Sequence, residues 1–277
     1  MTIFAAPFTR SYNSSDWIHP NPVHAFGRNT NQTYDIAPVG SRNPYTWQAI
    51  ALDDENFVYF DRISPGTSYA DAVFRHTETS GRFYKAITYW NGNGWTTRLS
   101  DGSMIVFPES YQAKKMADGA PYEIVGPAGN KLVLRRDADR NLQEIRTAHG
   151  VITIAHDDSG YITRAQDNEG RWVSYQYNSD GMLVSAIYSS GSERHYEYDD
   201  FRMTVVRDEK GHVLLRNQYA NGRNILAQQF EDGNVYRYLY QWTSNGQYAE
   251  RAGVLLPDGT QRIIETGSSV SGYLKRQ

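Results

Sequence analysis

The sequence predicts an all-β protein built from stacked antiparallel β-hairpins, and three observations support this prediction. A motif recurs about every 21 residues through the second half of the chain. Within each copy, apolar and polar residues alternate with a period of two, which is typical of a strand with one buried face. Tyrosine and glycine are abundant, with 21 and 23 residues among 277, and they favour strands and turns respectively.

Six residues anchor the repeat at nearly constant spacing. The spacings between consecutive anchors are 20, 21, 21, 21 and 21 residues, for Arg136, His156, Tyr177, Tyr198, Tyr219 and Tyr240. A glycine stands six to eight residues before each anchor. A single motif of this kind arises easily by chance, but six copies in phase indicate a repeat protein.

Each anchor begins a motif of the form Tyr-Asp-x-x-Gly-x-Leu, which predicts a turn followed by a return strand. The copies at 156–162 and 177–183 are clear, and later copies diverge. The aspartate of such a turn accepts hydrogen bonds from the backbone, and the glycine adopts a positive φ. We therefore expect structural roles for a set of turn residues: Asp137, Asp157, Gly160, Gly181 and Asp199.

The residues before each anchor predict the other strand of the hairpin. Val173, Tyr175 and Tyr177 alternate with polar residues and share one face. A second turn, such as residues 167–170, joins one unit to the next. A single hairpin cannot bury its apolar face, so we expect the units to stack. Neighbouring anchors would then pair across strands, each pair contributing about 0.2–1 kcal/mol.

The first part of the chain predicts short hairpins without a regular repeat. We expect a hairpin around residues 53–56, strands within 83–90 and 95–107 with tight turns at 91–92 and 101–102, and one helical turn near 111–116. Residues 68–71 fit a capping box before a short helix, and a strand fits residues 72–74 equally well. These patterns divide the chain into a β-rich preamble (1–121), a repeat sheet (122–245), and a terminal hairpin and tail (246–277).

The repeat motif resembles the YD-repeat, or RHS (rearrangement hotspot), family. This family includes bacterial polymorphic toxins, the C components of insecticidal toxin complexes and animal teneurins. The likeness covers roughly residues 126–245, and short motifs between Phe8 and Pro108 resemble the segment before the repeats in bacterial members. In the family, such repeats wind a β-sheet into a spiral, hollow shell that encloses a C-terminal effector in toxins. The resemblance therefore implies a curved or spiral sheet and a segment of such a shell.

The chain departs from the complete family pattern in three ways. We identify in this sequence no Pro-Ala-Ala-Arg spike domain, no self-cleaving C-terminal core and no effector after the repeats. The resemblance thus implies the N-terminal portion of a shell or a short stand-alone relative, with the remainder of a shell or a toxin cargo as partner. It also implies a bacterial protein, secreted or delivered outside the cell by sequence that is not present here. We expect this chain alone to enclose no folded cargo, because a ring of about 16 strands has a narrow lumen.

The sequence contains no pattern typical of an enzyme or a cofactor site. Paired carboxylates such as Asp157 and Asp158 lie in predicted turns, and the histidines lack the spacing of a zinc motif. Cysteine is absent, which excludes a thiolate metal site and a thiol nucleophile. The net charge of −3 provides no basic face for nucleic acid, and no apolar segment predicts a membrane span or a signal peptide. We therefore predict a non-enzymatic structural module without cofactor or metal.

An alternative function is a cell-surface binding module for carbohydrate or a partner protein. The polar face of the repeat strands would carry this function, because Trp172, His195 and Arg237 could form an aromatic and basic strip. A solvated sheet face accounts for the same three residues. A glycan array would separate the two functions, and a clear hydrolytic site would have favoured an enzyme over both.

Overall fold

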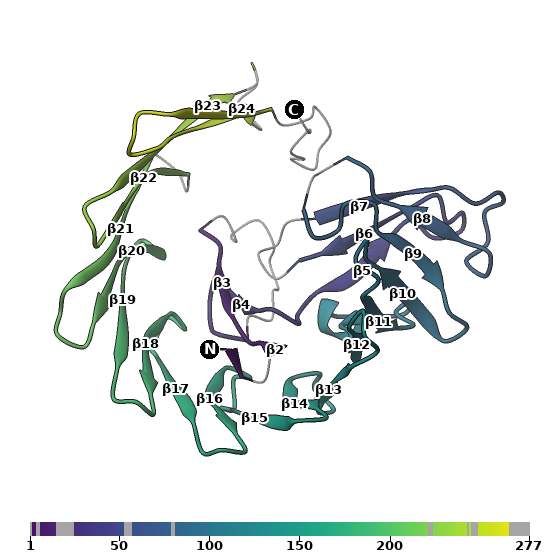
Figure 1. Cartoon of the computed structure of the whole chain (residues 1–277), viewed down its shortest axis with the longest axis horizontal. Helices are drawn as coiled ribbons and strands as arrows, with labels where there is room; N and C mark the ends of the chain where they lie inside the picture. Colours follow the sequence, from purple (N-terminus) through teal and green to yellow (C-terminus); the bar gives the residue numbers. More distant parts are fainter. Residues whose placement is uncertain are drawn as a thin grey trace. The chain divides into compact units, whose positions relative to one another are not determined.

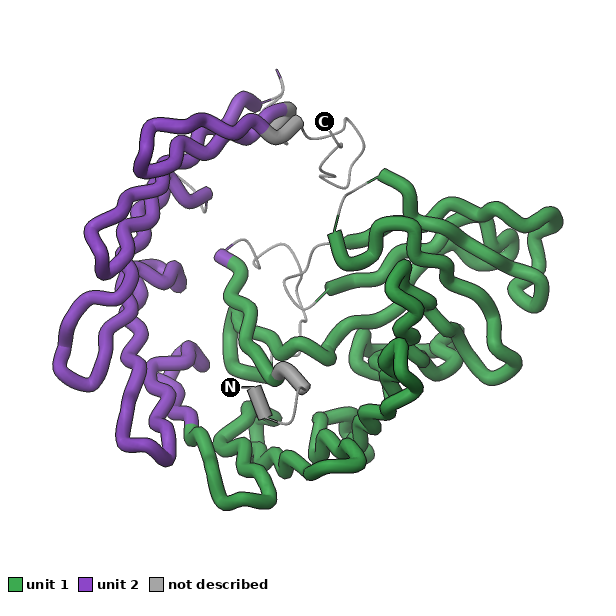
Figure 2. The backbone as a smooth tube through the Cα atoms, in the orientation of Figure 1, with its two compact units in different colours: residues 1–13, 19–174 green, residues 14–18, 175–277 purple. Residues whose placement is uncertain are grey.

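The computed structural model describes residues 2–3, 6–14, 25–52, 57–78, 81–220, 224–242, 244 and 249–265. In this part of the chain the protein is all-β, with a single short 3-10 helix at Met116–Gly119. The predicted fold class of stacked antiparallel hairpins is confirmed. The chain forms two compact units, which are described separately: unit 1 is residues 1–13 and 19–174, and unit 2 is residues 14–18 and 175–277 (Figure 2).

Unit 1 begins with two small two-stranded sheets and continues into a long antiparallel meander (Figure 1). The small sheets pair β1 (Thr2–Ile3) with β2 (Ala6–Pro7), and β3 (Arg10–Tyr12) with β4 (Thr30–Gln32). In the meander each strand pairs with the next along the chain. Its strands are β5 (Ala37–Gly40), β6 (Trp47–Ala51), β7 (Phe57–Arg62), β8 (Val73–Arg75), β9 (Ile87–Trp90), β10 (Gly94–Arg98), β11 (Met104–Pro108), β12 (Glu123–Val125), β13 (Lys131–Arg136), β14 (Leu142–Thr147), β15 (Gly150–His156), β16 (Ile162–Asp167) and β17 (Trp172–Tyr177), whose last residues belong to unit 2.

Unit 2 continues with hairpins of the same kind. Its strands from β18 to β25 also pair in chain order and antiparallel. They are β18 (Leu183–Tyr188), β19 (Glu193–Asp199), β20 (Arg202–Asp208), β21 (Val213–Tyr219), β22 (Ile225–Phe230), β23 (Val235–Trp242), β24 (Ala249–Leu255) and β25 (Gln261–Glu265). The predicted terminal hairpin corresponds to β24 and β25.

An aromatic core fills unit 1 between strands β5 and β11. The side chains of Phe60, Phe74 and Phe107 are fully buried, and Ile50 and Ile105 pack in the same cluster. Ile105 and Phe107 lie two residues apart on β11 and therefore share the face that enters this cluster, as the period-two pattern requires. Burial of side chains this large is the main favourable contribution to folding.

The turn between β15 and β16 is closed by hydrogen bonds to Asp157. At Asp157, the backbone N–H of Gly160 donates to the Asp157 carbonyl at 3.0 Å, and Gly160 has a φ of 84°. The Asp157 carboxylate accepts from the N–H groups of Ser159 and Tyr161, both at 2.9 Å. A type I turn followed by a glycine bulge has this geometry and fixes the register of the hairpin.

The preamble differs from the expected pattern in several details. Residues 73–75 form a strand, which is one of the two alternatives that the sequence leaves open, and the expected helical turn lies later, at Met116–Gly119. The strand expected from residue 83 begins at Ile87, because successive turns bond Tyr84 to Gly81 and Ala86 to Phe83. The hairpin loop expected at residues 53–56 lies outside the described residues.

The division into three segments at residues 122 and 245 stays a prediction. The two compact units meet in sequence at residues 174 and 175, inside the predicted repeat region. Among the described residues, no helix is long and apolar enough to cross a bilayer.

Candidate functional site

Three tyrosine anchors of unit 2, in successive repeats, make the same hydrogen bond. Each phenolic hydroxyl donates to a backbone carbonyl at the start of a return strand, 15 or 16 residues earlier in the chain. The bonds run from Tyr198 to Leu183 at 2.8 Å, from Tyr219 to Met203 at 2.8 Å and from Tyr240 to Ile225 at 3.0 Å. Each anchor therefore connects its own repeat to the preceding one.

A change in strand register accompanies most of the anchors. The pairing shifts by one residue immediately before four of them: Arg136, His156, Tyr198 and Tyr219. A bulge of this kind bends the strand and redirects the side chain beside it. Tyr240 makes the same bond although its strand shifts only after it, between Gln241 and Trp242, so the bond does not require a bulge before the anchor.

The first two anchors are not tyrosines and make different contacts. The Arg136 guanidinium lies 2.8 Å from the Asp35 carboxylate and donates to the Tyr34 carbonyl, also at 2.8 Å. The His156 ring lies 3.4 Å from the Gln143 amide. Burial lowers the pKa of His156, against the opposing effect of nearby carboxylates. Arg136 thus connects the first repeat to the segment before β5. It bonds two partners there, Tyr34 and Asp35, whereas a tyrosine has only one donor.

The turn residues fall into two groups. Asp137 and Asp157 accept backbone N–H groups, and Gly160 and Gly181 have φ values of 84° and 75°. Asp199 lies at a two-residue turn, where Asp200 and Phe201 take φ values of 48° and 62°. Its carboxylate is 79% exposed and lies 3.5 Å from Arg202. This copy has no glycine, so the turn is of another type and the Asp199 side chain caps no backbone group in it. The structural roles of this set stay predictions.

The predicted strip of Trp172, His195 and Arg237 spans both units. Trp172, on β17, packs under the Arg164 guanidinium, 4.4 Å from the ring centroid. His195, on β19, lies 2.9 Å from Glu193, and Arg237 is exposed on β23. Three strands separate His195 from Arg237, a distance of roughly 19 Å at ~4.8 Å per strand. Within unit 2, the structure therefore does not bring these two side chains together, and sugar binding by the strip stays a prediction.

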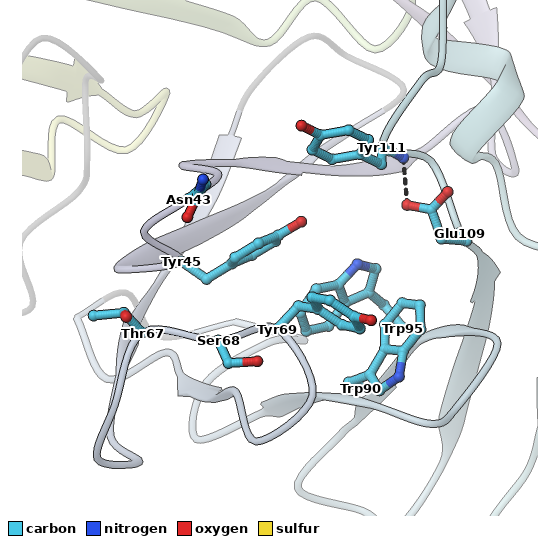
Figure 3. Close-up of a pocket in the computed structure, with 9 residues that line it drawn as sticks. All are labelled: Asn43, Tyr45, Thr67, Ser68, Tyr69, Trp90, Trp95, Glu109 and Tyr111. Carbon is cyan, nitrogen blue, oxygen red and sulfur yellow. Dashed lines mark hydrogen bonds between the residues drawn. The ribbon is translucent and has the colours of Figure 1, made fainter.

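A pocket in unit 1 gathers aromatic side chains that the sequence analysis did not connect (Figure 3). Its volume is about 650 Å³, and we refer to it as the aromatic pocket. It forms where the ends of β9 to β11 meet the loops after β5 and β7. The lining residues are Asn43, Tyr45, Thr67, Ser68, Tyr69, Trp90, Trp95, Glu109 and Tyr111.

The aromatic rings of the pocket form a connected wall. Trp90 and Trp95 are opposite each other on β9 and β10, with ring centroids 5.5 Å apart and planes at 76°. Tyr69 packs edge-on against Trp90 at 5.0 Å, and Tyr45 lies 6.2 Å from Trp95. Trp95 is only 3% exposed, whereas Tyr69 and Tyr111 are 47% and 57% exposed. The pocket thus has a buried floor and an accessible aromatic rim.

Arg62 holds one side of the pocket in place. Its guanidinium donates to the carbonyls of Tyr45 at 2.7 Å and Ser68 at 2.8 Å, and pairs with Asp71 at 2.9 Å. The Arg62 side chain is 7% exposed. Further bonds to the Ser64 and Pro65 carbonyls complete its contacts with the loop. One buried cation therefore fixes the loop after β7 against the segment that carries Tyr45.

Glu109 is the acidic residue that lines the aromatic pocket. It accepts the backbone N–H of Tyr111, which orients the chain after β11 (Figure 3). Arg42 lies 3.9 Å from this carboxylate, donates to the Ser110 carbonyl at 3.1 Å and lies over the Tyr111 ring. Neighbouring charge therefore partly compensates Glu109, which leaves the pocket without a strong net charge.

Asp167, outside the pocket, is a buried carboxylate that has a structural partner in Arg171. The Asp167 side chain is fully buried. Burial acts to raise its pKa, but hydrogen bonds from the Arg171 side chain and from the backbone hold that pKa below its usual value. No group of three or more histidine, aspartate or glutamate side chains in the described part of the chain is arranged to hold a metal ion.

Comparisons with known proteins give distant similarities. No family model matches the chain. Among curated proteins it is similar to teneurin-4 of Mus musculus, with 20% identity over 201 residues, covering 70% of this chain and 7% of teneurin-4. Two solved structures are also similar. One is TcdB2–TccC3 without its hypervariable C-terminal region (TM-score 0.36, 11% identity, 88% of this chain and 15% of that chain). The other is the Tc holotoxin pore of Photorhabdus luminescens with a TccC3 mutation (TM-score 0.35, 10% identity, 82% and 15%). The chain spans less than a sixth of each of these proteins.

Proposed function

We propose that the chain is a non-enzymatic structural module, a segment of an RHS or YD-repeat shell associated with toxin encapsulation or delivery. The observation that carries this proposal is the anchor bond, which recurs from one repeat to the next in unit 2. The resemblance of the motif to YD repeats and the match to teneurin-4 over 70% of the chain support it. The partner would be the remainder of a shell or a toxin cargo, outside the bacterial cell.

The anchor bond suits a wall built by repetition. A lone hairpin is marginally stable in water, and stacking supplies the missing burial. The tyrosine hydroxyl adds a side-chain bond between neighbouring hairpins, and at Met203 it shares the carbonyl with the Asn217 amide. Burial raises the pKa of Tyr240, which keeps that hydroxyl protonated as a donor. The repeat can therefore extend a sheet in which successive hairpins are bonded to each other.

Co-expression tests the shell proposal directly. The full chain would be produced together with the products of the neighbouring reading frames and purified by size exclusion. We expect a stable complex in which a partner domain resists protease that digests it when free. If no neighbouring product binds, or if the bound partner is digested at its free rate, the shell proposal is wrong.

A second candidate function is a surface binding module for carbohydrate or a partner protein. The aromatic pocket of unit 1 favours this candidate, because a concave site with aromatic walls and a few polar groups is typical of ligand binding. A glycan array with the full chain tests it, and the chemistry of the ligand can be narrowed further.

A further inference from the structure

We propose that the aromatic pocket of unit 1 binds a neutral, hydroxyl-rich ligand of the oligosaccharide class. This inference deepens the second candidate function and does not depend on the shell. It rests on three features of the pocket: its exposed aromatic faces, its polar groups and its balance of charge.

The size and walls of the aromatic pocket suit a short sugar chain. Its volume of about 650 Å³ falls within the roughly 300–1,000 Å³ of small-molecule sites. The C–H faces of a sugar ring carry partial positive charge and pack against the negative face of an aromatic ring. Tyr69 and Tyr111 stand half-exposed at the rim, where they offer such faces. The buried Trp95 closes the floor of the pocket.

The polar groups of the pocket require a ligand that both donates and accepts hydrogen bonds. Asn43, Thr67 and Ser68 line it alongside the tyrosine hydroxyls, and these groups can act in either direction. The Glu109 carboxylate only accepts. The hydroxyl groups of a sugar can donate hydrogen bonds to the Glu109 carboxylate when the bound ligand shields it from water. A proline-rich peptide also favours aromatic grooves, but its tertiary amides donate nothing, so Glu109 would gain no donor beyond the Tyr111 N–H that it already accepts.

The charges around the pocket disfavour ionic ligands of either sign. The Arg62 guanidinium lies behind the Tyr45 and Ser68 backbone, and Arg42 lies 3.9 Å from Glu109. These cations oppose a quaternary ammonium group, which aromatic cages otherwise attract. Glu109 in turn opposes a phosphate or a carboxylate. A neutral ligand meets neither penalty.

The pocket is also held in its shape before any ligand binds. Arg62 fixes the loop that carries Ser68 and Tyr69 through several carbonyl bonds. The two tryptophans are fixed by their strands. Rigid sites lose less conformational entropy on binding, which raises the affinity that a small contact can reach.

A binding experiment with defined probes tests this proposal. The full chain would be titrated with neutral trisaccharides of glucose, N-acetylglucosamine, galactose and mannose, and followed by tryptophan fluorescence and calorimetry. We expect at least one trisaccharide to bind with a Kd of about 1 mM or lower, which is a modest affinity for a small neutral ligand. Tyr69→Ala and Tyr111→Ala should each weaken that binding by about tenfold, the equivalent of a 1.4 kcal/mol contact.

Matched controls separate a specific site from a general effect. Tyr122→Ala removes another tyrosine of unit 1, 45% exposed and outside the pocket, and should leave binding unchanged. Glu109→Gln keeps an acceptor oxygen and should reduce sugar binding only slightly, whereas it would abolish binding of a cation. Circular dichroism would verify that every variant is folded.

Three outcomes would overturn the proposal. The first is that no trisaccharide binds at about 10 mM, which is well above the expected Kd. The second is tighter binding of tetramethylammonium or of a proline-rich peptide than of any sugar. The third is equal loss of binding in Tyr122→Ala and Tyr69→Ala. None of these results bears on the co-expression test of the shell, so the two proposals fail independently.

Discussion

The two units of the molecule are stabilised in different ways. In unit 1, strands β5 to β11 enclose a core in which Phe60, Phe74 and Phe107 have no exposed surface. The last strands of unit 2 carry large apolar side chains that remain 41–56% exposed, at Leu226, Phe230, Leu239, Trp242 and Ile263. Unit 2 instead repeats the anchor bond between neighbouring hairpins. The comparison shows that one unit depends on long-range burial and the other on contacts between adjacent repeats.

The two units also differ in how far apart in the sequence their interacting residues lie. The aromatic pocket of unit 1 needs residues 43 to 111 from four separate segments to converge. The anchor bonds of unit 2 join residues only 15 or 16 positions apart. Repeat proteins generally follow this nearest-neighbour pattern, and their stability is roughly a sum over adjacent units.

The largest expected effect concerns the core of unit 1. Phe74→Ala should lower the free energy of unfolding by about 3–5 kcal/mol, because it empties a fully buried site. Leu239→Ala, at a side chain 56% exposed in unit 2, should change it by less than about 0.5 kcal/mol. Chemical denaturation of both variants would measure the contrast. Equal losses would contradict the distinction between the two units.

The anchor bond should have a smaller and more local effect. Tyr219→Phe keeps the ring and removes the hydroxyl that reaches the Met203 carbonyl. We expect a loss of about 1 kcal/mol, the net value of one hydrogen bond, and faster amide hydrogen exchange at the start of β20. Tyr236→Phe, within β23 in the same unit, serves as the control. If the two variants lost the same stability, the hydroxyl bond would not be the cause.

The two kinds of turn should also differ. Asp157→Ala removes an acceptor of two backbone N–H groups and should cost about 1 kcal/mol. Asp199→Ala removes an exposed carboxylate that caps no turn amide and should cost less than about 0.5 kcal/mol. Thermal unfolding of the two variants would rank them, and the opposite order would contradict the assignment of the turns.

The smallest effect should appear as a dependence on pH. Burial lowers the pKa of His156 in the folded state, so the unfolded state binds the proton first as the pH falls. Stability should be complete above the unfolded pKa of about 6.5 and decrease as the pH falls below it. His156→Tyr restores the residue of the later anchors and should flatten this dependence. Melting temperatures between pH 7.5 and 5 would show it, and identical slopes for the two proteins would exclude His156 as the source.

The sequence predicted the local parts of the fold and missed the non-local ones. The turn at Asp157 and Gly160 involves only residues within five positions of each other, so a local sequence pattern is enough to predict a turn there. The strand at 73–75 remained ambiguous, because only its pairing with β7 and β9 decides between helix and strand. The type of turn at Asp199 also depended on Phe201 accepting a positive φ, which a bulky side chain rarely does.

The aromatic pocket could not be found by searching for motifs. Tyr45, Tyr69 and Tyr111 lie outside the strands, in segments whose spacing shows no pattern. The available signal was the number of aromatic residues in turns and loops of the preamble, where rings gain little from pleated packing. Their convergence depends on Arg62, whose bonds to distant carbonyls no sequence pattern reveals.

The anchor bond gives the array a direction. Each of these tyrosine hydroxyls bonds to a carbonyl of the preceding hairpin. A whole repeat can therefore be inserted or removed, and every remaining anchor still has a carbonyl to bond. A shift of one residue in the register would break this correspondence and turn the side chains of the shifted strand to the opposite face of the sheet. The repeat sheet can therefore lengthen or shorten in steps of about 21 residues. The start of the array is not free in this way, because Arg136 requires Asp35 and Tyr34 as its partners. Such a chain would diversify in evolution by copying hairpins downstream of a fixed beginning.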